Sequence, residues 1–184
     1  MSTATDSILG NCTAQTRIDT PLGPLLLART QAGLAGAWFD HQKHHPLPIA
    51  APERAHDPLL VRAAAQLRDY FDGVGYAFDV QLDLQGTDFQ QRVWAELLRI
   101  APGATCSYGA IAARLGRPAA GRAVGTAVGR NPVSIIVPCH RVIGSNGALT
   151  GYAAGLDRKT ALLALERRRC PKGAPALPVQ LELH

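Results

Sequence analysis

The chain has 184 residues, of which 47% are hydrophobic and 18% charged, a composition that excludes a disordered protein and suits one solid domain or two small ones. Its net charge of +5 is compatible with a polyanionic partner but does not identify one. No apolar run approaches the roughly 18 residues that a membrane-spanning helix requires, and residues 1–10 lack the apolar core of a signal peptide. We therefore expect a cytoplasmic protein with reduced thiols and no membrane contact.

The cysteines show no metal or disulfide pattern. They are widely scattered and contain no C-x-x-C pair: Cys12, Cys106, Cys139 and Cys170. This spacing argues against a zinc knuckle and against a disulfide framework. A histidine cluster offers a metal site together with Cys12, but a solvated loop among prolines is the favoured interpretation of His41, His44 and His45. We predict no metal and no cofactor.

The first half of the chain predicts a small α/β unit. Residues 17–20 and 25–29 indicate two strands joined by a Pro-Leu-Gly-Pro turn, and residues 33–39 indicate a third. After a proline-rich loop, Asp57 as N-cap and Pro58 begin a helix that Gly73 ends. Its apolar face is predicted from helical spacing: Leu60, Ala64, Leu67 and Phe71. Residues 76–84 alternate weakly and are a candidate strand. No reactive constellation occurs here, so we interpret this half as a scaffold.

At Gly86 the character of the sequence changes. Thr87 and Gln90 match a capping box, and the apolar spacing that follows predicts a helix that residues 102–103 (Pro-Gly) stop. Ser107 caps a second, short helix over residues 108–115, and a third helix is predicted over residues 119–130. Two short helices joined by a glycine-containing turn are typical of a helix-turn-helix motif, which often meets DNA.

The third helix carries glycine at every fourth residue, at Gly121, Gly125 and Gly129. Each glycine costs roughly 1 kcal/mol relative to alanine in a helix interior. A smooth face of this kind lets a backbone approach closely, which suits either packing against another helix or the floor of a DNA groove. Arg122 follows small residues, Ala120 and Gly121, at the position where recognition residues of such motifs usually lie.

Residues 135–143 form an apolar β-branched run, typical of a strand, that Pro138-Cys139-His140 interrupts. Cysteine is a strong nucleophile only as thiolate, and its ordinary pKa of about 8.5 leaves little thiolate at neutral pH. Successive side chains of a strand point to opposite faces, so either Pro138 ends the regular ladder or a water links His140 to Cys139. A buried structural cysteine is the alternative.

The last part of the chain supplies a loop and a helix. Residues 151–155, Gly-Tyr-Ala-Ala-Gly, form a flexible loop that suits a flat ligand. A helix is predicted over residues 157–168, and Glu166 lies at the margin of its apolar face. A pair with His140 would satisfy this carboxylate and hold the imidazole in one tautomer. The alternative is a surface salt bridge to Arg167 or Arg169, which is worth little.

Pro138-Cys139-His140-Arg141-Val142, with Gly151-Tyr152 and a helix ending in Glu166, closely resembles the O6-alkylguanine-DNA alkyltransferases, the methylated-DNA–protein-cysteine methyltransferases. The resemblance covers about residues 86–168 and includes Ser107-Tyr108, residues 121–125 (Gly-Arg-Ala-Val-Gly) and Asn131-Pro132. It implies an α/β N-terminal domain (ribonuclease-H-like) over residues 1–85 and a mostly α C-terminal domain over residues 86–170. The latter holds a helix-turn-helix and a short strand carrying Pro-Cys-His, and a mobile tail follows over residues 171–184.

The resemblance also implies a mechanism. Cys139 takes the alkyl group from O6 of a flipped guanine and keeps it; O4-methylthymine is a further candidate substrate. His140, oriented by Glu166, accepts the thiol proton through a water. Tyr108, with Lys159 near it, donates a proton to the leaving guanine. Asn131 ties the turn before Cys139 to the helix-turn-helix.

The remaining implied residues contact DNA or the base. Arg122 fills the gap left by the flipped base, and the following residues form the DNA-binding and pocket surfaces: Ala120, Gly121, Gly125, Tyr108, Val142, Tyr152, Ala153 and Cys139. The partner is double-stranded DNA carrying alkylated bases, bound without sequence preference by a monomer, with cooperative binding left open. Ala153 and Ala154 replace a Ser and a Gly of some relatives, and Ala154 is expected to narrow the pocket.

Three rival functions stay open at this point. A non-catalytic damage-binding protein of the alkyltransferase-like branch would lack the cysteine, which is present here. A helix-turn-helix regulator would prefer one operator sequence. A cysteine hydrolase using Cys139, His140 and Glu166 would need an oxyanion hole and would turn over repeatedly.

Overall fold

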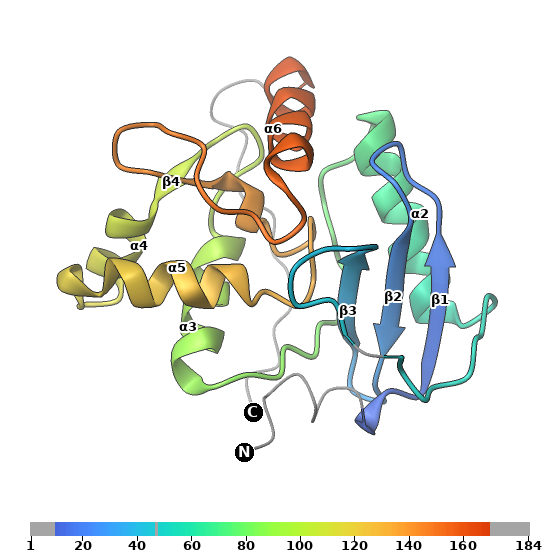
Figure 1. Ribbon diagram of the computed structural model, residues 1–184. Helices are drawn as coiled ribbons and strands as arrows, with labels where there is room; N and C mark the ends of the chain where they lie inside the picture. Colours follow the sequence, from blue (N-terminus) through green and yellow to red (C-terminus); the bar gives the residue numbers. More distant parts are fainter. Residues whose placement is uncertain (1–9, 47, 170–184) are drawn as a thin grey trace.

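The computed structural model describes residues 10–46 and 48–169. The N-terminal part forms a three-stranded antiparallel sheet in the order β1 (Ala14–Ile18), β2 (Leu25–Arg29) and β3 (Leu34–Phe39). Helix α2 (Pro58–Asp72) covers one face of this sheet (Figure 1). The two later strands were predicted closely, whereas the first lies earlier in the chain than the predicted 17–20. Residues 76–84 make only an isolated bridge, Leu34 with Leu82, so the fourth strand predicted there is wrong.

Helix α2 confirms both of its predicted ends. The Asp57 side chain accepts from the backbone N–H groups of residues 59 and 60, and Gly73 closes the helix in the left-handed region at φ 70°. Leu60 and Leu67 of the predicted face are buried, whereas the other two buried residues of the helix are Ala63 and Tyr70. The predicted Ala64 and Phe71 are half-buried and pack against the edge of the same core, while Tyr70 is fully buried.

The C-terminal part is mostly helical. Its helices are α3 (Asp88–Leu98), α4 (Tyr108–Arg114), α5 (Gly121–Gly129) and α6 (Leu156–Arg169). The capping box of α3 is confirmed, since Thr87 accepts from the Gln90 backbone and the Gln90 side chain accepts from the Thr87 backbone. Ser107 caps α4 as predicted. The third helix is shorter than predicted, because a 3₁₀ turn, η1 (Pro118–Ala120), precedes α5.

Figure 1 shows the sheet and α2 on one side of the molecule and α3, α4 and α5 on the other, with α6 rising between them. One continuous apolar core joins the two parts. Backbone pairing also crosses between them, because Ala37 of β3 forms a bridge with Val133. The short strands β4 (Cys106–Ser107) and β5 (Val142–Ile143) pair in parallel, and this pairing brings the start of α4 beside the Pro-Cys-His segment.

Candidate active site

Cys139, His140 and Arg141 form a single 3₁₀ turn, η2 (Cys139–Arg141), directly before β5. The strand expected over residues 135–137 is wrong: these residues form a turn, and Ile135 has a φ of 72°. A β-branched residue in this region is strained, and such strain concentrates at functional sites. Of the two alternatives raised for this segment, the first is confirmed: Pro138 ends the regular strand ladder, and a helical turn follows it.

The three side chains of η2 are buried, with exposed fractions of 4%, 0% and 5% for Cys139, His140 and Arg141. Asn131, also buried, explains how the turn is held. Its side-chain N–H donates to the carbonyls of Val133 (3.3 Å) and Val137 (2.8 Å) and to Cys139 Sγ (3.0 Å), and its Oδ1 accepts from the Val133 N–H (3.0 Å). Asn131 therefore contacts the thiol itself, a contact that the resemblance did not specify.

The Glu166 carboxylate lies against His140, with 2.8 Å between Nε2 and Oε1. Both side chains are fully buried, so the surface salt bridge considered for Glu166 is excluded. Arg141 donates to both carboxylate oxygens at 2.8–3.1 Å, and the Gly103 backbone N–H donates to Oε2 at 2.9 Å. The Tyr70 hydroxyl, from α2, donates to Oε1 at 2.9 Å.

These contacts determine the charge of the pair. Burial alone would raise the pKa of Glu166, but the hydrogen bonds and positive charges of His140 and Arg141 outweigh it and hold this pKa far below its ordinary value. Burial lowers the pKa of His140, against the opposing effect of Glu166. Since Nε2 faces an ionised carboxylate, Nε2 carries the proton and Nδ1 is the basic nitrogen. Within the part of the chain that the structure describes, Nδ1 has no protein hydrogen-bond partner.

Burial raises the pKa of the Cys139 thiol to about 11, although the Asn131 hydrogen bond and the Lys159 charge act in the opposite direction. The resting residue is therefore a thiol at neutral pH, and it needs a base when it reacts. Among the described residues, no hydrogen bond joins the Cys139 thiol to the His140 imidazole, whose Nδ1 has no protein partner. A proton can therefore pass from the thiol to the imidazole only through a bridging molecule or after one of the two side chains moves.

Tyr108 and Lys159 converge on the loop that follows β5. The Tyr108 hydroxyl donates to the Thr150 carbonyl at 3.1 Å, and the fully buried Lys159 ammonium donates to the same carbonyl at 2.7 Å and to that of Val142 at 2.6 Å. Burial lowers the pKa of Lys159. The two predicted residues therefore lie close together beside β5, because both donate to the Thr150 carbonyl.

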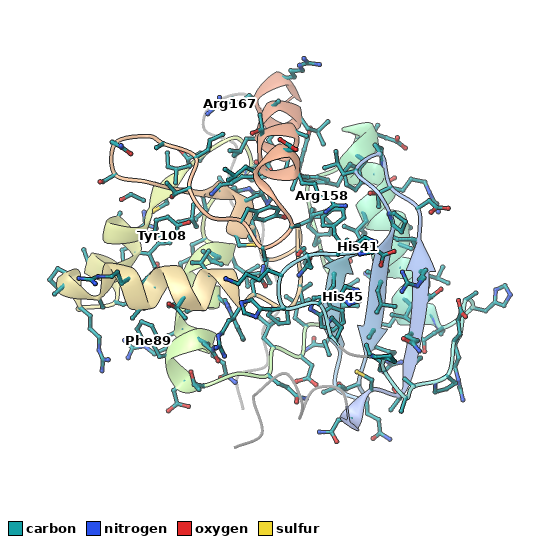
Figure 2. The ribbon with its side chains drawn as sticks, in the orientation of Figure 1. His41, His45, Phe89, Tyr108, Arg158 and Arg167 are labelled. Atoms are coloured by element: carbon teal, nitrogen blue, oxygen red, sulfur yellow. The ribbon has the colours of Figure 1, made fainter. Side chains whose placement is uncertain are left out.

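The N-terminal part holds the 151–155 loop from the other side. The Lys43 backbone N–H donates to the Ala153 carbonyl at 2.8 Å. Arg158 lies between the two parts (Figure 2): it donates to the carbonyls of Leu22 and Ala154 and stacks on the ring of Phe39, 4.7 Å from its centroid. Among the predicted pocket residues, Val142 and Ala154 are buried, while Tyr152 and Ala153 are half-buried.

Helix α5 presents Arg122 to solvent, and Ala120 and Gly121 beside it are half-buried. Within residues 10–46 and 48–169, a side chain at Gly121 or Gly129 would meet nothing within 4 Å, so these two glycines do not pack against another of the described helices. Gly125 instead faces the Tyr108 ring, where an added Cβ would lie 3.8 Å from it. Packing against the described helices therefore accounts for Gly125, which faces Tyr108 of α4, but not for Gly121 or Gly129.

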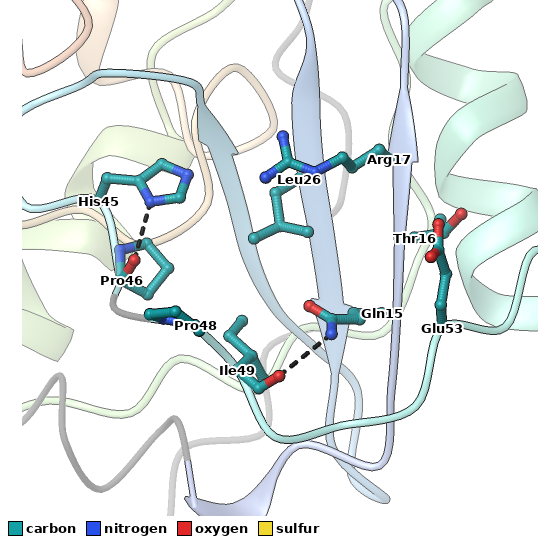
Figure 3. Close-up of a pocket in the computed structure, with 9 residues that line it drawn as sticks. All are labelled: Gln15, Thr16, Arg17, Leu26, His45, Pro46, Pro48, Ile49 and Glu53. Atoms are coloured by element: carbon teal, nitrogen blue, oxygen red, sulfur yellow. Dashed lines mark hydrogen bonds between the residues drawn. The ribbon is translucent and has the colours of Figure 1, made fainter.

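Two other features lie away from this site. Figure 2 shows His41 and His45 beside the sheet, far from Tyr108, and the described residues contain no group of three His, Cys, Asp or Glu side chains placed to hold a metal. A cavity of about 430 Å³ lies between β1, β2 and the loop after β3 (Figure 3). Gln15, Arg17 and His45 are among its lining residues, and none of its lining residues belongs to the site around Cys139.

Sequence reasoning missed three contributors to the site: Tyr70, Gly103 and Arg141 as a ligand of Glu166. Arg141 could have been suspected, because an arginine next to the reactive dipeptide needs an acidic partner when it is buried. Tyr70 carries only the signal of an apolar helix stripe. Its contact with Glu166 joins residues 96 positions apart.

Comparison with known proteins agrees with this geometry. Residues 88–168 match the 6-O-methylguanine DNA methyltransferase DNA binding domain, and residues 14–84 match the ribonuclease-like domain of the same proteins. The chain belongs to the 6-O-methylguanine DNA methyltransferase family. The family assignment confirms the expected fold class, a ribonuclease-like α/β domain followed by a mostly helical DNA-binding domain.

Individual members of this methyltransferase family are similar along most of their length. The methylated-DNA–protein-cysteine methyltransferase of Mycobacterium tuberculosis is 52% identical over 158 residues, which cover 84% of this chain and 92% of that protein. The Methanosarcina barkeri protein of the same name is 48% identical over 149 residues, covering 81% and 94%. The crystal structure of M. tuberculosis OGT in complex with DNA superimposes with a TM-score of 0.76 at 50% identity, covering 87% of this chain and 96% of that one.

Proposed function

We propose that this chain repairs DNA by direct reversal of damage, as a methylated-DNA–protein-cysteine methyltransferase whose acceptor is Cys139. The observation that carries the proposal is the buried Cys139 thiol, held by Asn131 and followed by a fully buried His140–Glu166 pair. The alternative of a purely structural cysteine would not require an ionised carboxylate behind the adjacent imidazole.

The transfer balances as an in-line displacement. Cys139 Sγ forms a bond to the alkyl carbon while the bond from that carbon to guanine O6 breaks. The thiol proton passes through a water to His140 Nδ1, and Glu166 stabilises the imidazolium that results. Tyr108 supplies a proton to the leaving guanine, and Lys159, which shares a carbonyl with it, favours that donation. The thioether product is stable, so each molecule acts once.

Base flipping is required by geometry. The O6 atom of a paired guanine lies inside the stack, where no buried thiol could approach its alkyl carbon in line. The unstacking cost of a few kcal/mol is lowest for a poorly pairing damaged base, which contributes to selectivity. Arg122 is exposed at the start of α5, and we infer that it enters the stack in place of the flipped base.

The surface around Arg122 supports binding through phosphates rather than base edges. The half-buried small residues Ala120, Gly121 and Gly125 let the α5 backbone lie close to DNA, and the net charge of +5 favours sequence-independent contact. The base pocket uses Val142, Tyr152 and Ala153 together with Cys139. We further infer a monomer acting in the cytoplasm, where Cys139 stays reduced. No helix among residues 10–46 and 48–169 is long and apolar enough to cross a membrane.

The experiment measures how many methyl groups one protein molecule accepts. Purified protein is incubated with excess duplex carrying radiolabelled O6-methylguanine in two unrelated sequence contexts. We expect one methyl per chain, the same rate in both contexts, and no transfer to a Cys139→Ser variant. Repeated turnover would indicate a hydrolase, and a strong preference for one sequence would indicate a regulator; either result contradicts the proposal.

A further inference from the structure

We propose that Tyr70, from the N-terminal part of the chain, is a positioning residue of the alkyl-transfer reaction, whose hydroxyl holds the Glu166 oxygen that orients His140. This inference rests on the proposed function of Cys139. It gives the N-terminal domain, which the sequence indicates only as a scaffold, a direct contact with the reaction's proton relay.

The contact is compact and fixed. The Tyr70 hydroxyl donates to Glu166 Oε1 at 2.9 Å and lies 3.5 Å from His140 Nε2, which is itself 2.8 Å from the same carboxylate oxygen. The Tyr70 ring is fully buried. Phe71 and Tyr76 meet it edge-on, with centroids 5.5 and 5.6 Å away, so neighbouring aromatic rings pack against the Tyr70 ring.

The hydroxyl donates to Glu166 because it keeps its proton. Burial, together with the Glu166 charge, raises the pKa of Tyr70 far above its ordinary value, so the proton stays on the phenol. The Tyr70 O–H and the His140 N–H then share one carboxylate oxygen. Arg141 also donates to this oxygen, and the Tyr70 hydroxyl is a further donor to it. Each added donor draws negative charge from the oxygen and limits how strongly Glu166 stabilises the imidazolium. Tyr70 thereby influences both the orientation of the imidazole and its basicity.

Other charged and titratable groups face the same pair. They come from η2, from α6 and from the 151–155 loop: Cys139, Arg141, Lys159 and Tyr152. All of them are retained when only the Tyr70 hydroxyl is removed. Because Tyr70 is fully buried, it makes no contact with DNA, and its removal should leave DNA affinity unchanged.

The test compares Tyr70→Phe with Tyr76→Phe, a matched control that removes a hydroxyl from the same aromatic cluster. Transfer is followed in single turnover at saturating O6-methylguanine duplex across a range of pH. For Tyr70→Phe we expect the rate constant of methyl transfer at neutral pH to fall about three- to tenfold. We also expect the acidic limb of its pH profile to move to higher pH by about one unit. The Kd for the duplex should not change, and Tyr76→Phe should keep the wild-type limb.

The outcomes separate this inference from the proposed function. If the wild-type protein transfers no methyl group, the proposed function fails. If the wild type transfers and Tyr70→Phe matches it in rate and pH profile, the role of Tyr70 is overturned.

A second variant covers the case in which Tyr70→Phe does not fold. Replacement of Tyr70 by 3-fluorotyrosine makes the hydroxyl a stronger donor while keeping the ring. The acidic limb should then move to lower pH, opposite to the shift in Tyr70→Phe. No shift, or a shift to higher pH, would contradict the inference.

Discussion

The buried carboxylate of Glu166 permits a quantitative test by the Glu166→Gln substitution. Among the described residues, four groups donate hydrogen bonds to its two oxygens: His140, Tyr70, Arg141 and the Gly103 backbone. Glutamine keeps the size of the side chain but replaces one oxygen by an NH₂ donor. In either orientation of the amide, some of these hydrogen-bond donors then face the glutamine NH₂, which cannot accept from them. The buried guanidinium of Arg141 also loses the negative charge that balances it.

Removing one partner of a buried ion pair costs about 3–5 kcal/mol. A change of this size lowers Tm by about 6–20 °C in a protein of this length, since each kcal/mol shifts Tm by about 2–4 °C. The rate of methyl transfer should fall about 10²-fold or more, because His140 loses the charge that stabilises its protonated form.

The assay is denaturant and thermal unfolding at neutral pH, with Asp79→Asn as a matched control. Asp79 pairs with Arg62 on the surface, where both side chains are more than half exposed, so its replacement should leave the midpoint near that of the wild type. A loss of less than about 1 kcal/mol in Glu166→Gln would refute the reasoning. Adding Arg141→Met should recover part of the loss, because it removes the stranded charge.

The same variant has a predicted pH dependence. Because the folded pKa of Glu166 lies below the unfolded value of about 4.3, its carboxylate stabilises the fold above that pH and loses this effect as the pH falls through the folded pKa. The stability difference between wild type and Glu166→Gln should therefore shrink as the pH is lowered below about 4. A difference that stays constant down to lower pH would show that the carboxylate charge is not its cause.

Two further predictions concern the thiol and the DNA surface. Burial raises the pKa of Cys139 to about 11, so the thiolate absorbance that is missing in Cys139→Ser should appear near pH 11. The free energy of unfolding should also fall as the pH rises above the ordinary thiol pKa toward 11, and a thiol titration near neutral pH would contradict this prediction. Arg122→Ala should weaken duplex binding and slow repair of duplex DNA more than transfer from free O6-methylguanine, whereas equal effects on both substrates would exclude a role in the stack.

Local sequence signals predicted the parts of the fold that depend on local physics. The Asp57 cap, the Gly73 stop and the Thr87–Gln90 capping box each satisfy backbone groups within a few residues, and all three are observed. The β-branched residues 135–137 predicted a strand and form a turn instead. Their conformation is decided by Asn131, whose amide gathers the carbonyls of this segment and the Cys139 thiol.

The relay around Glu166 illustrates the limit of reading a single sequence. Helical spacing placed Glu166 at the edge of an apolar face and suggested His140 as its partner, and the two side chains are in contact. Spacing within α2 could not reveal that Tyr70 contacts the same carboxylate, because that contact depends on how the N-terminal and C-terminal parts of the chain pack together. The glycine face of α5 likewise left two explanations open until the structure showed that Gly121 and Gly129 face open space.

The most direct test of the central claim is the mass of the peptide that contains Cys139. The protein is incubated with an equimolar amount of duplex carrying O6-methylguanine, digested and measured by mass spectrometry, with Cys139→Ser treated in parallel. We predict that the Cys139 peptide gains the mass of one methylene group, in proportion to the guanine restored in the DNA, and that the peptides of Cys12 and Cys106 gain nothing. Restored guanine without a mass gain at Cys139, or a gain at another cysteine, would contradict the account.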